Sequence, residues 1–291
     1  GGASGPSIDS RAELNSALVD RALAASPTPL ADSLLALVGA ESRFEQRDRV
    51  VEVFRAQLRL IAALVLAARL QFGVGPEAES GQVPELLRQL RGRGLTDGQW
   101  VALIRELLRP WQNSAEAHPL PLLVRLVHGR KSELLKLWDE LLVMRKSETV
   151  AHGATGTREA LQQILSKRVP QLGRTLELLE PLWTALKLVV PREWARDETA
   201  LQPASLFVGP TPTSGRFRRI ELSGAQAQEA NLPLLLSADG QPLLALAPIV
   251  IERKSGHEDR LFILDGPAKR GALYVRSEER RVGKECRLTC R

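Results

Sequence analysis

Two residues near the middle of the chain have types and a spacing suited to chemistry on a phosphate. Residues 141–153 read LLVMRKSETVAHG, in which Arg145 is followed by six residues and then by His152. A guanidinium holds a phosphate through paired N–H donors and stabilises developing negative charge, and an imidazole exchanges protons near neutral pH. Seven residues make about two helical turns, so both side chains can lie on one face. We therefore take Arg145 and His152 as candidate catalytic residues.

The same two residues also have a structural interpretation, which we prefer. Arg145 can pair with a nearby carboxylate, and His152 stands directly before Gly153, a residue type that commonly ends a helix. A cationic side chain at a helix C-terminus interacts favourably with the helix dipole. The spacing is compatible with both interpretations, and both stay open at this point.

With its apolar helix face, its arginine and its histidine, this segment resembles the HEPN superfamily. Domains of that superfamily are helical bundles whose signature is an Arg, four to six residues and then a His. Active members are metal-independent ribonucleases, usually with a site shared across a dimer. The resemblance implies an RNA substrate, a homodimer, no cofactor, and catalytic roles for Arg145 and His152. Lys146 stands where many members have Asn.

A second resemblance covers roughly residues 27–275. A helical region followed by LFVG, LLALAPIVI and LFILDG is similar to an accessory module of large bacterial signalling and conflict-response proteins, where it stands beside Ser/Thr kinase or NTPase domains. This resemblance implies a cytoplasmic, non-catalytic sensing or scaffolding module, with an effector domain expected after residue 275. We expect that function, with a HEPN-type ribonuclease as the alternative and RNA binding without cleavage as a third hypothesis.

Motifs of several other enzyme classes are absent from the sequence. It contains no GxxxxGKS/T phosphate loop, no HRD or DFG of a kinase, and neither HExxH nor GxSxG. Both cysteines, Cys286 and Cys290, lie close to the last residue, and no two histidines have metal-ligand spacing. The sequence therefore predicts neither a metal nor a cofactor. The histidines are His118, His128, His152 and His257.

Hydrophobic spacing predicts helices over most of the first 190 residues. Thr96 and Asp97 are of types that cap a helix N-terminus, and Ser132 suits the same role. Pro and Gly mark most segment ends. The predicted helices cover residues 12–25, 30–38 and 47–71, a short segment after Pro84, the segment from Thr96 to Pro110, residues 120–127, the segment after Ser132, and residues 157–189, the last kinked or split by Pro170, Gly173 and Pro181.

From Pro191 onward the sequence contains short apolar runs bounded by Gly and Pro, which are typical of strands. Ala238-Asp239-Gly240 lies between two of these runs and predicts a hairpin. The fold class is therefore α+β, a mainly helical bundle followed by a small antiparallel β domain. We expect a disordered or leading-helix segment at 1–26, a HEPN-like helical domain at 27–195 and the β domain at 196–275.

The last part of the chain, residues 276–291, resembles translated sequencing adapter, because residues 276–286 read RSEERRVGKEC. This segment holds six basic and three acidic residues, so the net charge of +6 falls to +3 without it. We therefore do not take basicity as a nucleic-acid signal. The longest uncharged apolar run, Leu60–Ala68, has nine residues, whereas a membrane span needs about twenty. The sequence predicts no membrane segment.

Two groups of arginines could bind an acidic or phosphorylated ligand. Those within residues 43–59 alternate with acidic residues, which is typical of a solvated helix surface with ion pairs. Arg216, Arg218 and Arg219 fall on a predicted strand, where they could contact a phosphate or an acidic partner, or protect an edge strand. The first group consists of Arg43, Arg47, Arg49, Arg55 and Arg59.

Overall fold

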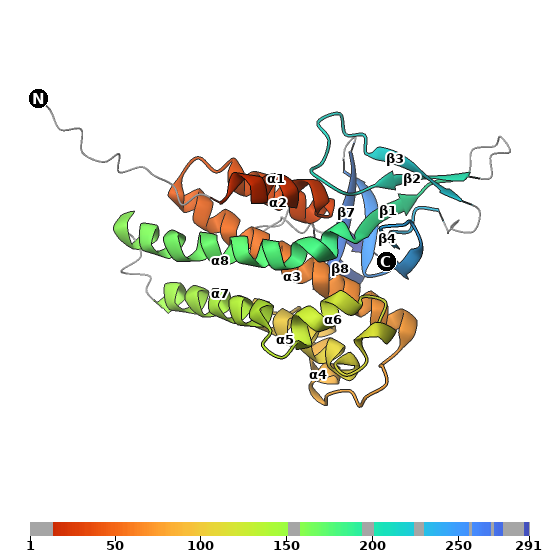
Figure 1. The fold of residues 1–291 in the computed structure, drawn as a ribbon, viewed down its shortest axis with the longest axis horizontal. Helices are drawn as coiled ribbons and strands as arrows, with labels where there is room; N and C mark the ends of the chain where they lie inside the picture. Colours follow the sequence, from red (N-terminus) through yellow and green to blue (C-terminus); the bar gives the residue numbers. More distant parts are fainter. Residues whose placement is uncertain are drawn as a thin grey trace, which may run out of the picture.

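The computed structural model describes residues 14–150, 158–193, 201–223, 230–255, 258–268, 271–275 and 288–290. Within them helices come first and antiparallel strands follow, which confirms the predicted α+β class (Figure 1). The helices are α1 (Ser16–Ala25), α2 (Thr28–Val38), α3 (Arg43–Phe72), α4 (Gln82–Gly92), α5 (Asp97–Leu108), α6 (Pro121–His128), α7 (Glu133–Val150) and α8 (Arg158–Thr184), with 3-10 turns at Arg109–Trp111 and Ala115–Ala117. The strands are β1 (Leu186–Pro191), β2 (Leu201–Leu206), β3 (Arg218–Ser223), β4 (Leu234–Ser237), β5 (Pro242–Ala245), β6 (Val250–Ser255), β7 (Glu258–Ala268), β8 (Gly271–Val275) and β9 (Leu288–Cys290).

Side-chain caps determine where several helices begin. Thr96 and Gln99 form a capping box at the start of α5, in which each side chain accepts the other residue's backbone N–H. The Ser132 hydroxyl accepts a backbone N–H from the first turn of α7. Both caps confirm predictions from the sequence. Ser42 caps α3 in the same way, so this helix begins four residues before its predicted start at Arg47.

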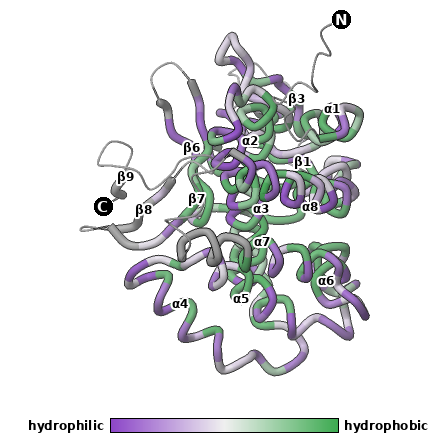
Figure 2. The backbone as a smooth tube through the Cα atoms, turned by 90° about the vertical axis from the view of Figure 1, so that its left-hand side faces the viewer, coloured by the Kyte–Doolittle hydropathy of each residue, from purple (hydrophilic) through white to green (hydrophobic). Residues whose placement is uncertain are grey.

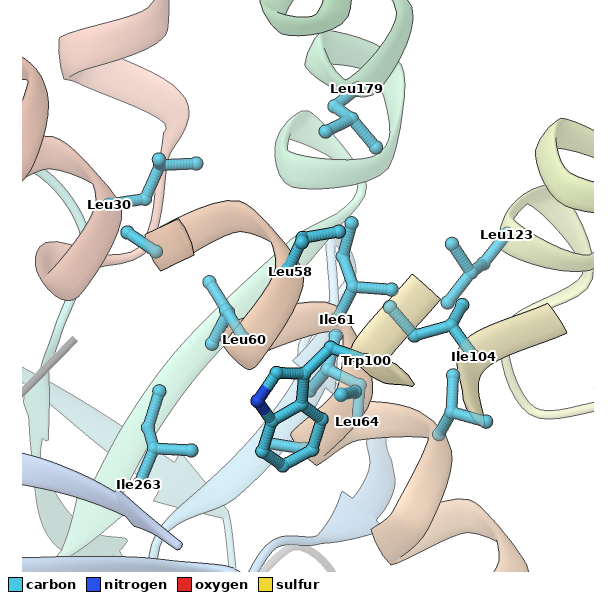
Figure 3. Packing of buried hydrophobic residues seen from close by; sticks show 14 of the residues in the cluster. Leu30, Leu58, Leu60, Ile61, Leu64, Trp100, Ile104, Leu123, Leu179 and Ile263 are labelled. Carbon is cyan, nitrogen blue, oxygen red and sulfur yellow. The ribbon is translucent and has the colours of Figure 1, made fainter. Parts of the chain in front are cut away.

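Helix α3 is the centre of the molecule. It has 30 residues, and in the view of Figure 2 α2, α8 and β7 lie around it. Its apolar run is buried in this core, and no helix in the described part of the chain is both long and apolar enough to cross a membrane. Figure 3 shows side chains of this core from α2, α3, α5, α6, α8 and β7, namely Leu30, Leu58, Leu60, Ile61, Leu64, Trp100, Ile104, Leu123, Leu179 and Ile263.

The strands form two antiparallel sheets. The first has the order β3-β2-β1-β4-β5, and the second has the order β6-β7-β8-β9. The central strand β1 of the first sheet is buried on both faces, because Leu188 and Val190 belong to the main core while Val189 belongs to a smaller cluster on the opposite face. The predicted hairpin at 238–240 joins β4 to β5, and Gly240 adopts the positive φ of 88° that this turn requires.

The end of the predicted helix 157–189 is wrong. Helix α8 runs unbroken past Pro170 and Pro181 but stops at Thr184, and the following residues form β1, the central strand of the first sheet. A strand buried on both faces is a continuous apolar run without a period of two, so hydrophobic spacing does not separate it from a helix end. The predicted run LLALAPIVIE is divided between β5 and β6, which belong to different sheets.

The helices and the second sheet meet at what we call the α3–β7 seam, formed by Arg59, Gly94, Asp265 and Gly266. Arg59 Nη2 lies 3.2 Å from Asp265 Oδ1, and the two side chains are 8% and 0% exposed. Asp265 stands at a register shift in β7, and the backbone of Gly266 lies so close to Gly94 that a Cβ would be 2.9 Å from the Gly94 Cα. One hydrophobic cluster continues from the helices into both sheets.

Candidate functional site

The structure describes only part of the predicted catalytic pair. Arg145 lies near the C-terminal end of α7, where the backbone is described and the side chain is not. His152 lies outside the described residues. The approach of the two side chains to one another therefore stays a prediction, and the backbone of α7 gives the available geometry.

Position 145 continues the packing face of α7. Leu134, Trp138 and Leu141 are buried, with exposed fractions of 1%, 0% and 5%. Their spacing of four and then three residues is the spacing of a helix stripe that packs against neighbouring helices. The next member of the same stripe is position 145.

Two contacts between the antiparallel helices α7 and α8 set their register. Arg174 Nε donates to Glu133 Oε1 at 2.7 Å, and Gln171 Nε2 donates to Glu140 Oε2 at 2.6 Å. Counting onward with equal rise along both helices places position 145 level with roughly residues 162–166 of α8. About one turn away lies Arg168, which is 1% exposed and has an interaction partner within the chain.

A different face of α7 borders an open groove between α7 and α8. The groove has a volume of about 550 Å³ and is lined by Lys136, Asp139, Glu140, Val143 and Gln171. Val143 is 63% exposed, and it is one of several large apolar side chains exposed in this structure. Helix geometry places it about 200° around the axis from position 145. The sequence analysis did not single out these residues, although Val143 is an apolar residue outside the buried stripe.

Three polar side chains of this groove contact one another. Lys136 Nζ lies 3.9 Å from Glu140 Oε1, and Gln171 donates to the same carboxylate group. A lysine, two carboxylates and an amide can hold a polar or charged partner around the apolar Val143. The described lining residues of the groove include no histidine, serine or cysteine.

The two well-described histidines have structural surroundings. His118 is 5% exposed, its Nδ1 accepts the Leu120 backbone N–H at 3.0 Å, and its ring meets Trp111 edge-on. Burial lowers the pKa of His118 to about 4, so the ring is neutral at pH 7. His128 Nε2 lies 2.8 Å from the carbonyl oxygen of Arg105. Among the described residues no group of three or more His, Cys, Asp and Glu is arranged to hold a metal.

The arginines of α3 are paired, as their alternation with acidic residues predicts. Arg49 contacts both Glu45 and Glu52 on its own helix. Arg55 Nε lies 3.2 Å from an oxygen of Asp97 in α5. Arg59 departs from the prediction of a solvated surface, because it is buried in the α3–β7 seam. Its partner is about two hundred residues away in the sequence, and no local pattern indicates such a pair.

The site has to be interpreted from its own residues. Comparisons of the chain with protein-family models, with curated proteins and with solved structures found no match. The resemblances to HEPN domains and to an accessory module of bacterial signalling proteins remain predictions from the sequence.

Proposed function

We propose that this chain is a non-catalytic scaffolding or sensing module of a larger bacterial signalling protein, acting in the cytoplasm beside an effector domain. The main support is that position 145 follows the buried Leu134, Trp138 and Leu141 at helix spacing. An arginine at a packing position serves structure by pairing with a carboxylate or by covering apolar surface with its stem. The open groove on the other face carries groups suited to binding.

The way in which the two parts are joined also supports a scaffolding role. The α3–β7 seam places a buried ion pair and a close backbone contact between the helices and the second sheet. Surfaces carried by a continuously packed body keep a defined distance and orientation. A partner held by the helices and another held by the sheets would therefore be positioned relative to each other. A kinase or NTPase effector is the partner expected from the family resemblance.

An RNA-cleavage assay with chelator tests the proposal against its catalytic alternative. We expect the purified chain to leave single-stranded RNA intact, and we expect Arg145→Ala to lower the midpoint of thermal unfolding. Arg130→Ala, an exposed arginine in the turn before α7, is the matched control and should leave that midpoint unchanged. RNA cleavage by the wild type that disappears in both Arg145→Ala and His152→Ala would contradict the proposal.

The alternative function is a HEPN-type metal-independent ribonuclease that uses Arg145 and His152, and one observation favours it. Position 145 lies about one turn from the buried Arg168 along the α7–α8 register. On this alternative the Arg145 guanidinium would donate paired hydrogen bonds to a phosphodiester, with the charge of Arg168 about one turn away along the register. On this alternative the active form is a homodimer, and His152→Ala removes cleavage while leaving RNA affinity largely unchanged.

A further inference from the structure

We infer that the outer edge of β3 is a docking site for an extended, acidic segment of a partner protein, which pairs with β3 as an additional strand. The inference rests on the proposed scaffolding function and names the chemistry of one partner. Three features of the described structure support it, namely an open backbone edge, a firmly held strand and arginines without acidic partners.

Strand β3 is the terminal strand of the first sheet. In the sheet order it has β2 on one side, with a register that runs from Leu201↔Ser223 to Leu206↔Arg218, and no described strand on the other. An edge strand directs half of its backbone N–H and C=O groups away from its sheet. Those groups can bond an added strand, which is a common way of binding extended peptides.

Strand β3 is held in place by packing on one of its faces and by contacts of the loop before it. Leu222 is buried in the smaller hydrophobic cluster, and Ile220 packs against it. The loop before β3 is tied to α2, because the backbone N–H and the hydroxyl of Thr211 donate to Asp32 at 2.7 and 2.6 Å. Phe217, directly before the strand, stacks on the buried Phe207. A preorganised edge loses little conformational entropy when a partner binds.

The arginines at this edge lack acidic partners within the described structure. Arg216, Arg218 and Arg219 are exposed, and none forms an ion pair with a described residue. Successive residues of a strand point to opposite faces, so an added strand would meet Arg218 on one face and Arg219 on the other. Arginine binds carboxylates through paired N–H donors. A partner segment with acidic residues at two adjacent positions therefore complements the edge.

The same features disfavour other occupants. A second copy of β3 is a poorer occupant, because antiparallel pairing centred on Ile220 would match Arg219 with Glu221 but leave Arg218 opposite Leu222, without an acidic partner. Single-stranded RNA binds mainly through bases stacked on aromatic side chains in a basic groove. The sequence of β3 is RRIELS, which has no aromatic residue. The ring of Phe217, directly before β3, packs against Phe207. An acidic peptide is the occupant that fits.

A peptide-binding experiment on the full chain tests this inference. The probe is a fluorescent peptide of about nine residues, made of Val and Thr with two adjacent Glu at its centre. Two matched peptides carry either Lys in place of Glu or Pro at alternate positions, since Pro removes backbone donors without changing charge. The protein variants are Arg218→Glu/Arg219→Glu and, as the control with the same change of net charge, Arg91→Glu/Arg93→Glu on exposed sites at the end of α4.

Fluorescence anisotropy should show binding of the Glu peptide alone. We expect the dissociation constant to rise at least about ten-fold in Arg218→Glu/Arg219→Glu and to change less than about two-fold in the control. Equal binding of the Pro peptide, equal binding by both variants, absence of Glu-peptide binding, or binding of oligouridylate instead would each overturn the inference. These outcomes leave the scaffolding proposal standing, because RNA cleavage and the joining of helices to sheets test that proposal separately.

Discussion

The α3–β7 seam and the β3 edge use the same residue type in opposite ways. In the seam, Arg59 is 8% exposed and lies against Asp265, so its charge faces a carboxylate inside the molecule and this ion pair joins helix to sheet. At the edge, Arg218 and Arg219 are exposed and have no acidic partner among the described residues. A buried arginine requires an acidic partner from its own chain, whereas an exposed arginine is solvated and can pair with a carboxylate of another protein. On this account the α3–β7 seam joins the helices to the second sheet, and the β3 edge binds the proposed acidic partner segment.

The largest effect on stability is expected from removing the carboxylate of the α3–β7 seam. Asp265→Ala leaves the Arg59 guanidinium buried without its carboxylate, and loss of one member of a buried pair costs about 3–5 kcal/mol. We expect a corresponding fall in the free energy of unfolding, measured with urea. Glu133→Ala removes an exposed, solvent-screened partner of Arg174 and should lower the unfolding free energy far less. Equal losses of unfolding free energy in the two variants would mean that the buried pair of the seam contributes no more than an exposed ion pair.

Acid should weaken the core at His118, a buried group without a charged partner. Its folded-state pKa of about 4 lies below the ordinary value of 6.5. Between these values the unfolded chain binds a proton that the folded chain does not, so stability falls as pH decreases from 6.5 to 4. The slope should approach about 1.4 kcal/mol per pH unit.

Urea unfolding of the wild type and of His118→Asn between pH 7 and pH 4 measures this contribution. Asparagine retains an acceptor for the Leu120 N–H but does not titrate. The difference in unfolding free energy between the two proteins should therefore change with pH in this window. Parallel pH profiles would show that another group is responsible for acid sensitivity.

A smaller loss is expected where the seam brings two backbones together. Gly266 has a φ of 151°, and a Cβ at this residue would lie 2.9 Å from the Gly94 Cα. Gly266→Ala should therefore cost about 1–3 kcal/mol of unfolding free energy. Gly92→Ala is the nearby control, because no atom lies within 4 Å of its Cβ position, and it should stabilise α4 slightly. Thermal unfolding of both variants gives the comparison.

The smallest effect on stability belongs to the β3 edge. Arg218→Ala/Arg219→Ala removes two exposed side chains that have no described ion pair, so the free energy of unfolding should change by less than about 0.5 kcal/mol. A loss as large as that of Asp265→Ala would assign these arginines a structural role. Chemical denaturation followed by circular dichroism distinguishes the two outcomes.

Local patterns in the sequence predicted the local structure well. The cap at Thr96, the cap at Ser132 and the hairpin at 238–240 each depend on a few adjacent residues whose chemistry is visible in the sequence. The same holds for the paired charges within α3, because partners three or four residues apart lie on one helix surface.

Features that depend on distant residues were not predictable in this way. Strand β1 follows α8 after one residue, and its burial on both faces removes the alternation that identifies a strand. The pairing of Arg59 with Asp265 exists only after α3 and β7 have come together. The candidate site is a similar case. The spacing of Arg145 and His152 can be read from the sequence, but the sequence does not indicate which face of α7 is open.

Native-state hydrogen exchange of the full chain tests most directly whether helices and sheets form the one body that scaffolding requires. Backbone amides of α3 around Arg59 and of β7 around Leu261 should be protected by the same free energy, and Asp265→Ala should lower protection in both segments together. Early exchange in β7 while α3 stays protected, with the variant affecting β7 alone, would contradict the account.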